Sequence, residues 1–475
     1  MQFSFYMFFY CARVCLKIIS AACITRNFQF RKFLSVNSNL CYTVVTVLKG
    51  DKNQDTMNDI YTTYLQIIKN NFIKTGRNTN QNHTPSGESF AESFQREKEL
   101  RILPEDISAL SVLAGKHFTS PFLLPYVKSN PQVYTAFKQQ TKQMMFQYYQ
   151  IEHLTEIIVS LMNREQIPYY LLKGISLAAY YPVPEYRKLG DVDLYIPDPA
   201  AFEKAKKVLE ANGFVLDPEL SDHHTTYIYT FPKTGRRYIL ELHFRIVGVY
   251  QYDKANQIVD QVFSKRQLTP ELQKIGDLTY RVLPPTEYTF YMIHHMLKHY
   301  LYSGFGIRLL CDFVLYLTAR NNDIDFDKLH QWCKESKILH FYEIIIETLH
   351  LYLGLPADIE PDIHYPSDTC DTFIQRILED RDMGTSNDTA LVGSGSYAKV
   401  NFWTYFKEGH LQMKVRFPKL HKCVILWPVL WGITFVCFIW NTYHYRHTTF
   451  KETLEGFKKT NEDSQLIKIF ENEDV

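Results

Sequence analysis

The sequence LGDVDLYI at residues 189–196 decides how this chain folds. Asp191 and Asp193 alternate with apolar residues, and this period of two predicts a β-strand over 191–196. Because successive side chains of a strand point to opposite faces, the two carboxylates share one face, while Val192 and Leu194 point into a core. Two carboxylates beside a glycine turn are able to hold Mg²⁺ against a triphosphate. A solvated strand face is the alternative interpretation, since D-x-D is a common pattern.

The segments on either side favour metal binding. Upstream, a strand over 169–172 runs into a turn at Lys173 and Gly174, and a short helix follows over 175–181. Downstream, the pattern predicts a helix over 199–213, a strand over 214–216, and a hairpin of strands 227–231 and 238–244.

The second hairpin strand supplies a third carboxylate. In YILELHF, Glu241 shares one face with Ile239 and His243, and the alternate residues Leu240, Leu242 and Phe244 are expected to pack inward. If this strand neighbours 191–196, the three carboxylates converge. The alternative for Glu241 is an exposed strand residue paired with Arg237 or Arg245.

The Lys-Gly turn, the short helix, GDVD and the later ELH together resemble the nucleotidyltransferase superfamily, and most of all its uncharacterised bacterial family 5 type, over residues 100–420. The resemblance implies an α+β fold, with a small mixed sheet, flanking helices and a helical domain. It also implies transfer of a nucleoside monophosphate from an NTP to an acceptor hydroxyl. The acceptor is a small molecule, a protein or an RNA end. A non-catalytic nucleotide-binding module and a membrane-associated accessory protein are the alternatives.

The site residues follow from this resemblance and from side-chain chemistry. Asp191 and Asp193 are expected to bind Mg²⁺ or Mn²⁺, with Glu241 as a third ligand or as the general base. Nucleotide contacts are expected from Lys173, Gly174, Ser176, Arg187, Lys188 and Gly190. Further cleft candidates are His243, Lys298, His299, Arg308 and Asp312.

Three of the nucleotide contacts have alternatives. Ser176 comes one position later than in the superfamily pattern, so it either contacts phosphate or caps the next helix. Lys173 is otherwise a lysine at the rim of the site. Arg187 and Lys188 either clamp the triphosphate, a task that suits arginine, or are solvated loop charges.

Other motifs are given no catalytic role. His295 and His299 have zinc-like spacing but lack the glutamate of H-E-x-x-H, which favours a satisfied helix histidine or a nucleotide contact over a zinc ligand. His223-His224 are expected on a loop near the cleft in sequence, without a special function. The acids of residues 323–327 repeat the D-x-D spacing, but they precede a helical pattern, which favours helix capping. The kinase-like glycine run of residues 393–400 is rejected because no H-R-D or D-F-G element follows.

Composition bounds the partners and the compartment. The 475 residues carry a net charge of +1, so long nucleic acids are not favoured as partners and the NTP is the expected ligand. The chain has nine cysteines and no C-x-x-C pair, which indicates a reducing, cytoplasmic environment. Cys311, Cys333 and Cys370 are expected to be buried.

We expect five regions along the chain. They are an atypical extension over 1–56, a helical region over 57–163 with a polar linker at 76–92, the α/β domain over 164–282, a helical domain with an irregular part over 283–420, and a C-terminal segment over 421–475. The extension is a mitochondrial-type presequence, a poor signal anchor or translated upstream sequence before Met57, and we favour the last.

The helical regions contain individual predictions as well. Helices are expected over 57–72, 104–117, 131–163, 284–301, 307–317 and 326–353, with little regular structure over 356–420. The apolar run 423–440 is either a helix packed on the fold or a membrane contact.

Overall fold

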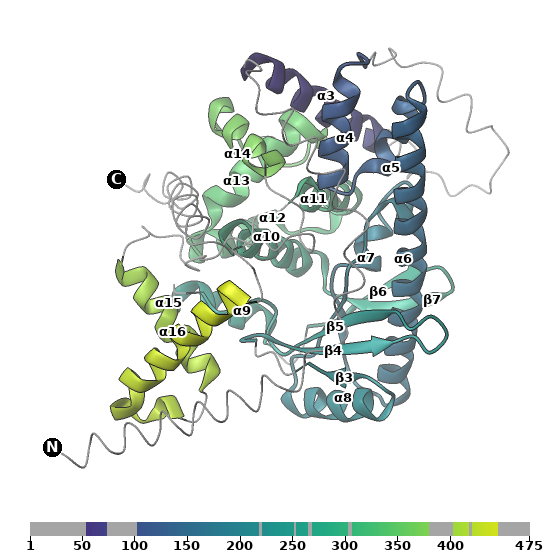
Figure 1. Cartoon of the computed structure of the whole chain (residues 1–475). Coiled ribbons are helices and arrows are strands. Elements are labelled where there is room, and N and C mark those ends of the chain that lie inside the picture. Colours follow the sequence, from purple (N-terminus) through teal and green to yellow (C-terminus); the bar gives the residue numbers. More distant parts are fainter. Residues whose placement is uncertain are drawn as a thin grey trace. The chain divides into compact units, whose positions relative to one another are not determined.

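The computed structural model describes residues 54–73, 102–217, 221–250, 253–264, 268–302, 306–379, 402–417 and 420–444 (Figure 1). The chain divides into two units, Met1–Asp59 and Ile60–Val475, and the features below belong to the second, apart from the start of α3. Most of the expected extension, the linker at 76–92 and the glycine run at 393–400 lie outside the described residues. The helix expected from Met57 is present as α3, Gln54–Ile73.

A five-stranded mixed sheet carries the candidate site (Figure 1). Its strands are β1 (Tyr170–Leu171), β2 (Val192–Tyr195), β3 (Val215–Leu216), β4 (His224–Thr230) and β5 (Arg237–His243), in the spatial order β1-β2-β5-β4-β3. Only β2 and β5 run parallel, and the other neighbours are antiparallel. The α+β class and the small mixed sheet predicted from the sequence are therefore confirmed.

The register of β2 and β5 follows from their alternating sequences. Asp193 lies beside Glu241, and Leu194 lies beside Leu242. The leucines of both strands are fully buried, so the core fixes which way the acids point. Phe244 was expected to pack inward but is 42% exposed, because β5 ends one residue before it.

Helices flank the sheet, and two of them begin with a side-chain cap. The long helix α6, Pro131–Arg164, contacts β2 and also α8, Pro199–Ala211. Asn130 and Asp198 precede these helices and accept hydrogen bonds from Val133 N and Ala201 N. Two shorter helices complete this part, α7 (Ile175–Ala178) and α9 (Asp253–Phe263).

A second hairpin was not predicted. It consists of β6 (Glu271–Ile275) and β7 (Leu278–Val282), and β7 packs against β1. Three shorter elements precede α6, namely α4 (Asp106–Lys116), α5 (Ser120–Leu123) and η2 (Leu124–Val127), and η3 (Pro184–Tyr186) lies between α7 and β2.

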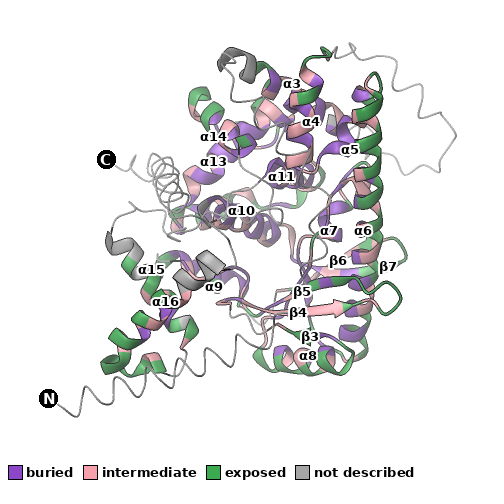
Figure 2. Ribbon diagram, viewed as in Figure 1, coloured by how far each residue is buried: buried purple, intermediate pink, exposed green. Residues whose placement is uncertain are grey.

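The helical part follows the second hairpin. It comprises α10 (Pro285–Tyr302), α11 (Ile307–Arg320), η4 (Asn321–Asp323), α12 (Phe326–Glu335), α13 (Leu339–Thr348), the π-helical turn η5 (Leu349–Leu353) and α14 (Ser367–Glu379). Figure 2 shows α11 as mostly buried, in keeping with the buried run from Leu309 to Leu317. The buried and free state of Cys311, Cys333 and Cys370 agrees with the prediction.

Two predictions for this part were wrong. The single helix expected over 326–353 is broken between α12 and α13, where Lys337 adopts φ +61°. The irregular region contains α14 and also α15, Phe402–Arg416. The capping role of the acids at 323–327 is confirmed, because Asp325 accepts a hydrogen bond from Lys328 N.

The apolar segment near the C-terminus forms η6 (Leu420–Lys422), η7 (Val424–Leu426) and α16 (Trp427–His444). Several of its large apolar side chains are exposed, including Ile425 at 88% and Phe435 at 62%. Among the helices that the structure describes, none combines the length and apolar character needed to span a bilayer.

Candidate active site

Three carboxylates gather at the adjoining strands β2 and β5. Asp193 and Glu241 are register neighbours, and Asp191 immediately precedes β2. His243 joins the two strands: its Nε2 donates to Asp193 Oδ1 at 3.1 Å and lies 3.4 Å from Glu241 Oε2. The partners of Glu241 are thus histidines, because Arg245 pairs instead with Asp260 at 2.8 Å.

Lys173 lies inside this acidic cluster and not at its rim. Its Nζ lies 3.2 Å from Asp193 Oδ2 and 3.7 Å from Asp191 Oδ2, and its side chain is largely buried. Burial alone would lower the pKa of Lys173, but Asp191, Asp193 and Glu241 together raise it above the usual value. The ammonium therefore stays charged and holds the carboxylates together.

The same charges and burial shift the pKa values of Asp191 and Glu241 in opposite directions. Burial and the neighbouring Asp193 raise the pKa of Asp191 to about 6, against the opposing charges of Lys173 and Arg308. Burial also acts to raise the pKa of Glu241, but its hydrogen bond with His243 and the charge of Lys173 outweigh this and lower it. Of Asp191 and Glu241, Asp191 is thus the one that takes up a proton more readily.

The turn before α7 explains the need for glycine. Gly174 adopts φ +69° and ψ −128°, a conformation that other residues rarely reach, and it places Lys173 against the acids. The next candidate, Ser176, is buried, and its hydroxyl bonds with Lys173 O at 2.9 Å and with Tyr288 Oη at 2.8 Å. In this structure the Ser176 hydroxyl therefore stabilises the turn from within.

Arg187 and Asp312 have a different role from the one expected. The Arg187 Nε and Nη2 atoms each donate to one carboxylate oxygen of Asp312 at 2.8 Å, and Tyr181 Oη donates to Asp312 at 2.7 Å. Both charged side chains are buried. Arg187 is therefore neither a solvated loop charge nor a free phosphate clamp, but one half of an internal ion pair that joins the loop before Asp191 to α11.

The rest of that loop stays near the acids. Gly190 is exposed, and the Lys188 ammonium lies 3.3 Å from the centre of the Phe118 ring. Arg308 Nη1 donates to the carbonyl of Lys188 at 2.6 Å, and its charge reaches Asp191. Arg308 thus adds positive charge close to Asp191.

Two histidines of the site were missed by the sequence analysis. His224 is the first residue of β4 and lies opposite His243, and His223 precedes it. His224 Nδ1 lies 3.8 Å from Glu241 Oε2, and His223 Nε2 accepts a hydrogen bond from Lys298 Nζ at 2.7 Å. The β-branched Thr225 and Thr226 were the signal that β4 begins before Tyr227.

Burial sets the charge of this histidine group. It lowers the pKa of His223 to about 3 and that of His224 to about 4, so both rings are neutral near pH 7. Burial also lowers the pKa of Lys298. His299 is likewise buried, with its ring centre 4.4 Å from that of His295 on the same helix.

The described residues contain two groups with the chemistry and spacing to hold a metal ion. The ligand atoms of Asp193, Glu241 and His243 lie within 4.8 Å of one another, and so do those of His223, His224 and His243. The first group is rich in carboxylate oxygen, which suits Mg²⁺ or Mn²⁺.

A family model described as "Uncharacterised nucleotidyltransferase" matches residues 104–354. The chain belongs to this nucleotidyltransferase family. The matched region contains every candidate site residue named above, although it ends before residue 420, where the resemblance was expected to end.

Other comparisons add little to the family match. An antigenic nucleotidyltransferase-like protein from Paracoccidioides brasiliensis is similar in its crystal structure, with 15% sequence identity and a TM-score of 0.30. The similarity covers 44% of this chain and 95% of that one. A search of curated proteins found no match.

Proposed function

We propose that this nucleotidyltransferase-family protein uses a divalent metal ion to transfer a nucleoside monophosphate from an NTP to an acceptor hydroxyl. The observation that carries the proposal is the gathering of Asp191, Asp193 and Glu241 around the ammonium of Lys173. Buried like charges repel one another strongly, so a protein retains such a group mainly where it binds cations or performs chemistry.

The residues present fit Mg²⁺ or Mn²⁺. Asp191 and Asp193 would hold the ion through carboxylate oxygens, the ligands that both ions prefer. Lys173 supports this fit, because a cationic group of the protein already lies 3.2 and 3.7 Å from two of these oxygens. When bound, the ion would neutralise charge that develops on the transferred phosphorus and on the leaving pyrophosphate.

The chain's own residues would orient the two reactants. Gly174 lets the backbone approach the triphosphate closely, and Lys173 and Arg308 supply positive charge beside it. Glu241 either completes the metal ligands or accepts the proton of the acceptor hydroxyl. The acceptor oxygen then bonds to the α-phosphorus, the bond to the bridging oxygen breaks, and pyrophosphate leaves.

The net charge of +1 favours a small molecule or a protein side chain over a long nucleic acid as acceptor. An RNA end also fits, because a single hydroxyl at a chain end needs few phosphate contacts.

The test is labelling of a lysate of the source cell by the purified protein with each of the four radiolabelled NTPs. Wild type should label an acceptor in the presence of Mg²⁺, and Asp193→Asn should reduce labelling at least ~10²-fold, because it removes charge from the centre of the site. Glu203→Gln is the matched control, since it removes an exposed acid on α8 that pairs only with Lys206 in the described structure.

The outcomes separate the alternatives. If wild type binds Mg·NTP but labels nothing, the protein is a nucleotide-binding module. If Asp193→Asn keeps its fold by circular dichroism and labels as well as wild type, the proposed role of the carboxylates is wrong.

A further inference from the structure

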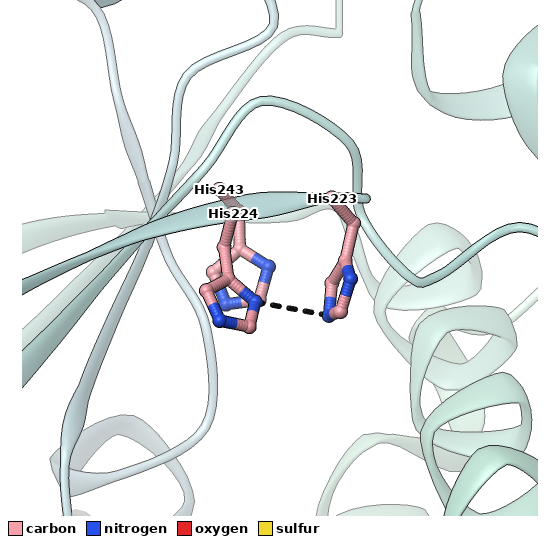
Figure 3. Close-up of side chains that lie close together, drawn as sticks. All are labelled: His223, His224 and His243. Atoms are coloured by element: carbon pink, nitrogen blue, oxygen red, sulfur yellow. Dashed lines mark hydrogen bonds between the residues drawn. The ribbon is translucent and has the colours of Figure 1, made fainter. Parts of the chain in front are cut away.

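Three imidazoles meet beside the carboxylates, where β4 begins and β5 ends (Figure 3). His223 faces the rings of His224 and His243, and one ring nitrogen of each lies within 4.8 Å of the others. His223 Nε2 and His224 Nδ1 are 3.1 Å apart. In a tetrahedral zinc site with Zn–N bonds of about 2.0–2.1 Å, neighbouring nitrogens are separated by roughly 3.3 Å. The spacing of these two histidines is therefore close to that of a metal-bound pair.

A carboxylate orients His223. Asp222 Oδ1 accepts a hydrogen bond from His223 Nδ1 at 2.6 Å, and Asp222 Oδ2 is itself fixed by Val249 N at 2.8 Å. With its proton on Nδ1, His223 directs the lone pair of Nε2 into the cluster. This arrangement of carboxylate, imidazole and ligand nitrogen is the one that commonly supports metal-binding histidines.

The lone pair of His223 already attracts cationic and polar hydrogens. Lys298 Nζ donates to His223 Nε2 at 2.7 Å, and His224 Nδ1 lies 3.1 Å from the same atom. His243 adds a buried Nδ1 atom for which no described residue provides a hydrogen-bond partner. His223 Nε2 is thus bonded to an ammonium, and His243 Nδ1 has no hydrogen-bond partner among the described residues. A bound cation would give such buried nitrogens a favourable partner.

We propose that His223, His224 and His243 form a binding site for one divalent transition-metal ion of the zinc class. Imidazole nitrogen suits Zn²⁺ and its neighbours in the first transition row, whereas Mg²⁺ requires oxygen ligands. Glu241 Oε2 lies 3.8 Å from His224 Nδ1 and is a candidate for a fourth ligand. The site is thus distinct in chemistry from the carboxylate group, although it shares His243 with that group.

Lys298 has a defined part in this proposal. Its ammonium takes the lone pair of His223 that the metal ion requires, so lysine and metal compete for one nitrogen. The histidine cluster is consequently stable without metal, and metal binding displaces Lys298 from His223. The proposal goes beyond nucleotidyl transfer and does not depend on it.

The experiment is isothermal titration of the full-length, chelator-treated protein with Zn²⁺, Co²⁺ or Mg²⁺ alone, in the absence of nucleotide. Wild type should bind one equivalent of Zn²⁺, and Co²⁺ should give the visible absorption spectrum of a nitrogen-ligated ion. Asp222→Asn should weaken Zn²⁺ binding about 10–100-fold, and His224→Ala should weaken it further. His153→Ala, which removes an exposed histidine on α6, should leave binding unchanged.

Lys298→Met separates loss of the site from misfolding. This variant should bind Zn²⁺ more tightly than wild type, and a misfolded protein would not gain affinity. The proposal is overturned if wild type binds Zn²⁺ no better than His224→Ala, or if Lys298→Met binds more weakly than wild type. Failure of Zn²⁺ binding together with retained Mg²⁺-dependent labelling by NTPs would reject this site and leave the proposed function intact. Zn²⁺ binding without labelling by NTPs would support this site and reject the proposed nucleotidyl transfer.

Discussion

Replacing Asp312 by Asn should destabilise the protein strongly, because Asp312 is half of a buried ion pair. Asp312 receives two hydrogen bonds of 2.8 Å from Arg187 and a third from Tyr181, and the charged side chains of Arg187 and Asp312 are 5% and 1% exposed. Removing one partner of such a pair leaves an uncompensated buried charge, which costs about 3–5 kcal/mol. Arginine does not escape this cost by losing its proton, and Asp312 raises the pKa of Arg187 further despite the opposing effect of burial.

The free energy of unfolding should be measured by urea denaturation, followed by far-UV circular dichroism and tryptophan fluorescence. The matched control is Asp323→Asn, whose carboxylate pairs with Arg320 at 2.8 Å but is 54% exposed, so its loss should cost at most about 1 kcal/mol. In the double variant Arg187→Met, Asp312→Leu most of the stability should return, because no charge is left buried.

Two results would refute the reasoning. One is a loss below about 1 kcal/mol in Asp312→Asn, equal to that of the exposed control. The other is a folded Arg187→Met protein of normal stability that binds NTP weakly, which would restore Arg187 as a phosphate clamp.

Three further predictions concern the turn, the pH dependence and the apolar segment. Gly174→Ala should lower the free energy of unfolding by about 1–3 kcal/mol and reduce labelling by NTPs, because alanine rarely adopts φ +69° and ψ −128°. Gly235→Ala, in a turn with φ +65°, is the control and should leave labelling intact. His117 donates a hydrogen bond to Leu378 O, and burial lowers the pKa of His117 to about 3. Below pH 6.5 this histidine therefore binds a proton in the unfolded chain but stays neutral in the folded chain. Stability should therefore fall from pH 7 to pH 5 by about 2 kcal/mol more in wild type than in His117→Phe, measured by urea denaturation at both values. If residues 423–440 contact a membrane, wild type should co-sediment with phospholipid vesicles, and Ile425→Glu should weaken vesicle binding about tenfold or more. Leu272→Glu, at an exposed position of β6, is the control and should leave vesicle binding unchanged. Absence of vesicle binding by wild type would contradict the membrane contact.

The part of the site that could be predicted depends on the alternation of apolar and polar residues within single strands. In β2 and β5 the leucines must face the core, and this alone places Asp193 and Glu241 on one face. The long helix α6 was equally accessible, because its apolar stripe repeats at helical spacing. The adjacency of β2 and β5 remained a condition in the sequence analysis, since pairing of strands so far apart is not encoded locally.

The parts that could not be predicted depend on partners that are distant in sequence. Arg187 meets Asp312 across 125 positions, so local sequence shows only a charged loop residue and a helix acid. Lys173 likewise has the same sequence signature whether it lies at a rim or inside the cluster. His223 and His224 were assigned to a loop because the hairpin was expected to start at Tyr227, and three more residues of strand pairing bring His224 opposite His243.

The charges of the site indicate in which form a nucleotide would be bound. Lys173 already compensates Asp191 and Asp193. The carboxylates therefore gain little from a free divalent ion, which would add positive charge next to the ammonium of Lys173. A triphosphate that arrived with the ion would remove this obstacle, because its negative oxygens would give Lys173 a new partner. We therefore predict that free Mg²⁺ binds more weakly than the Mg·NTP complex.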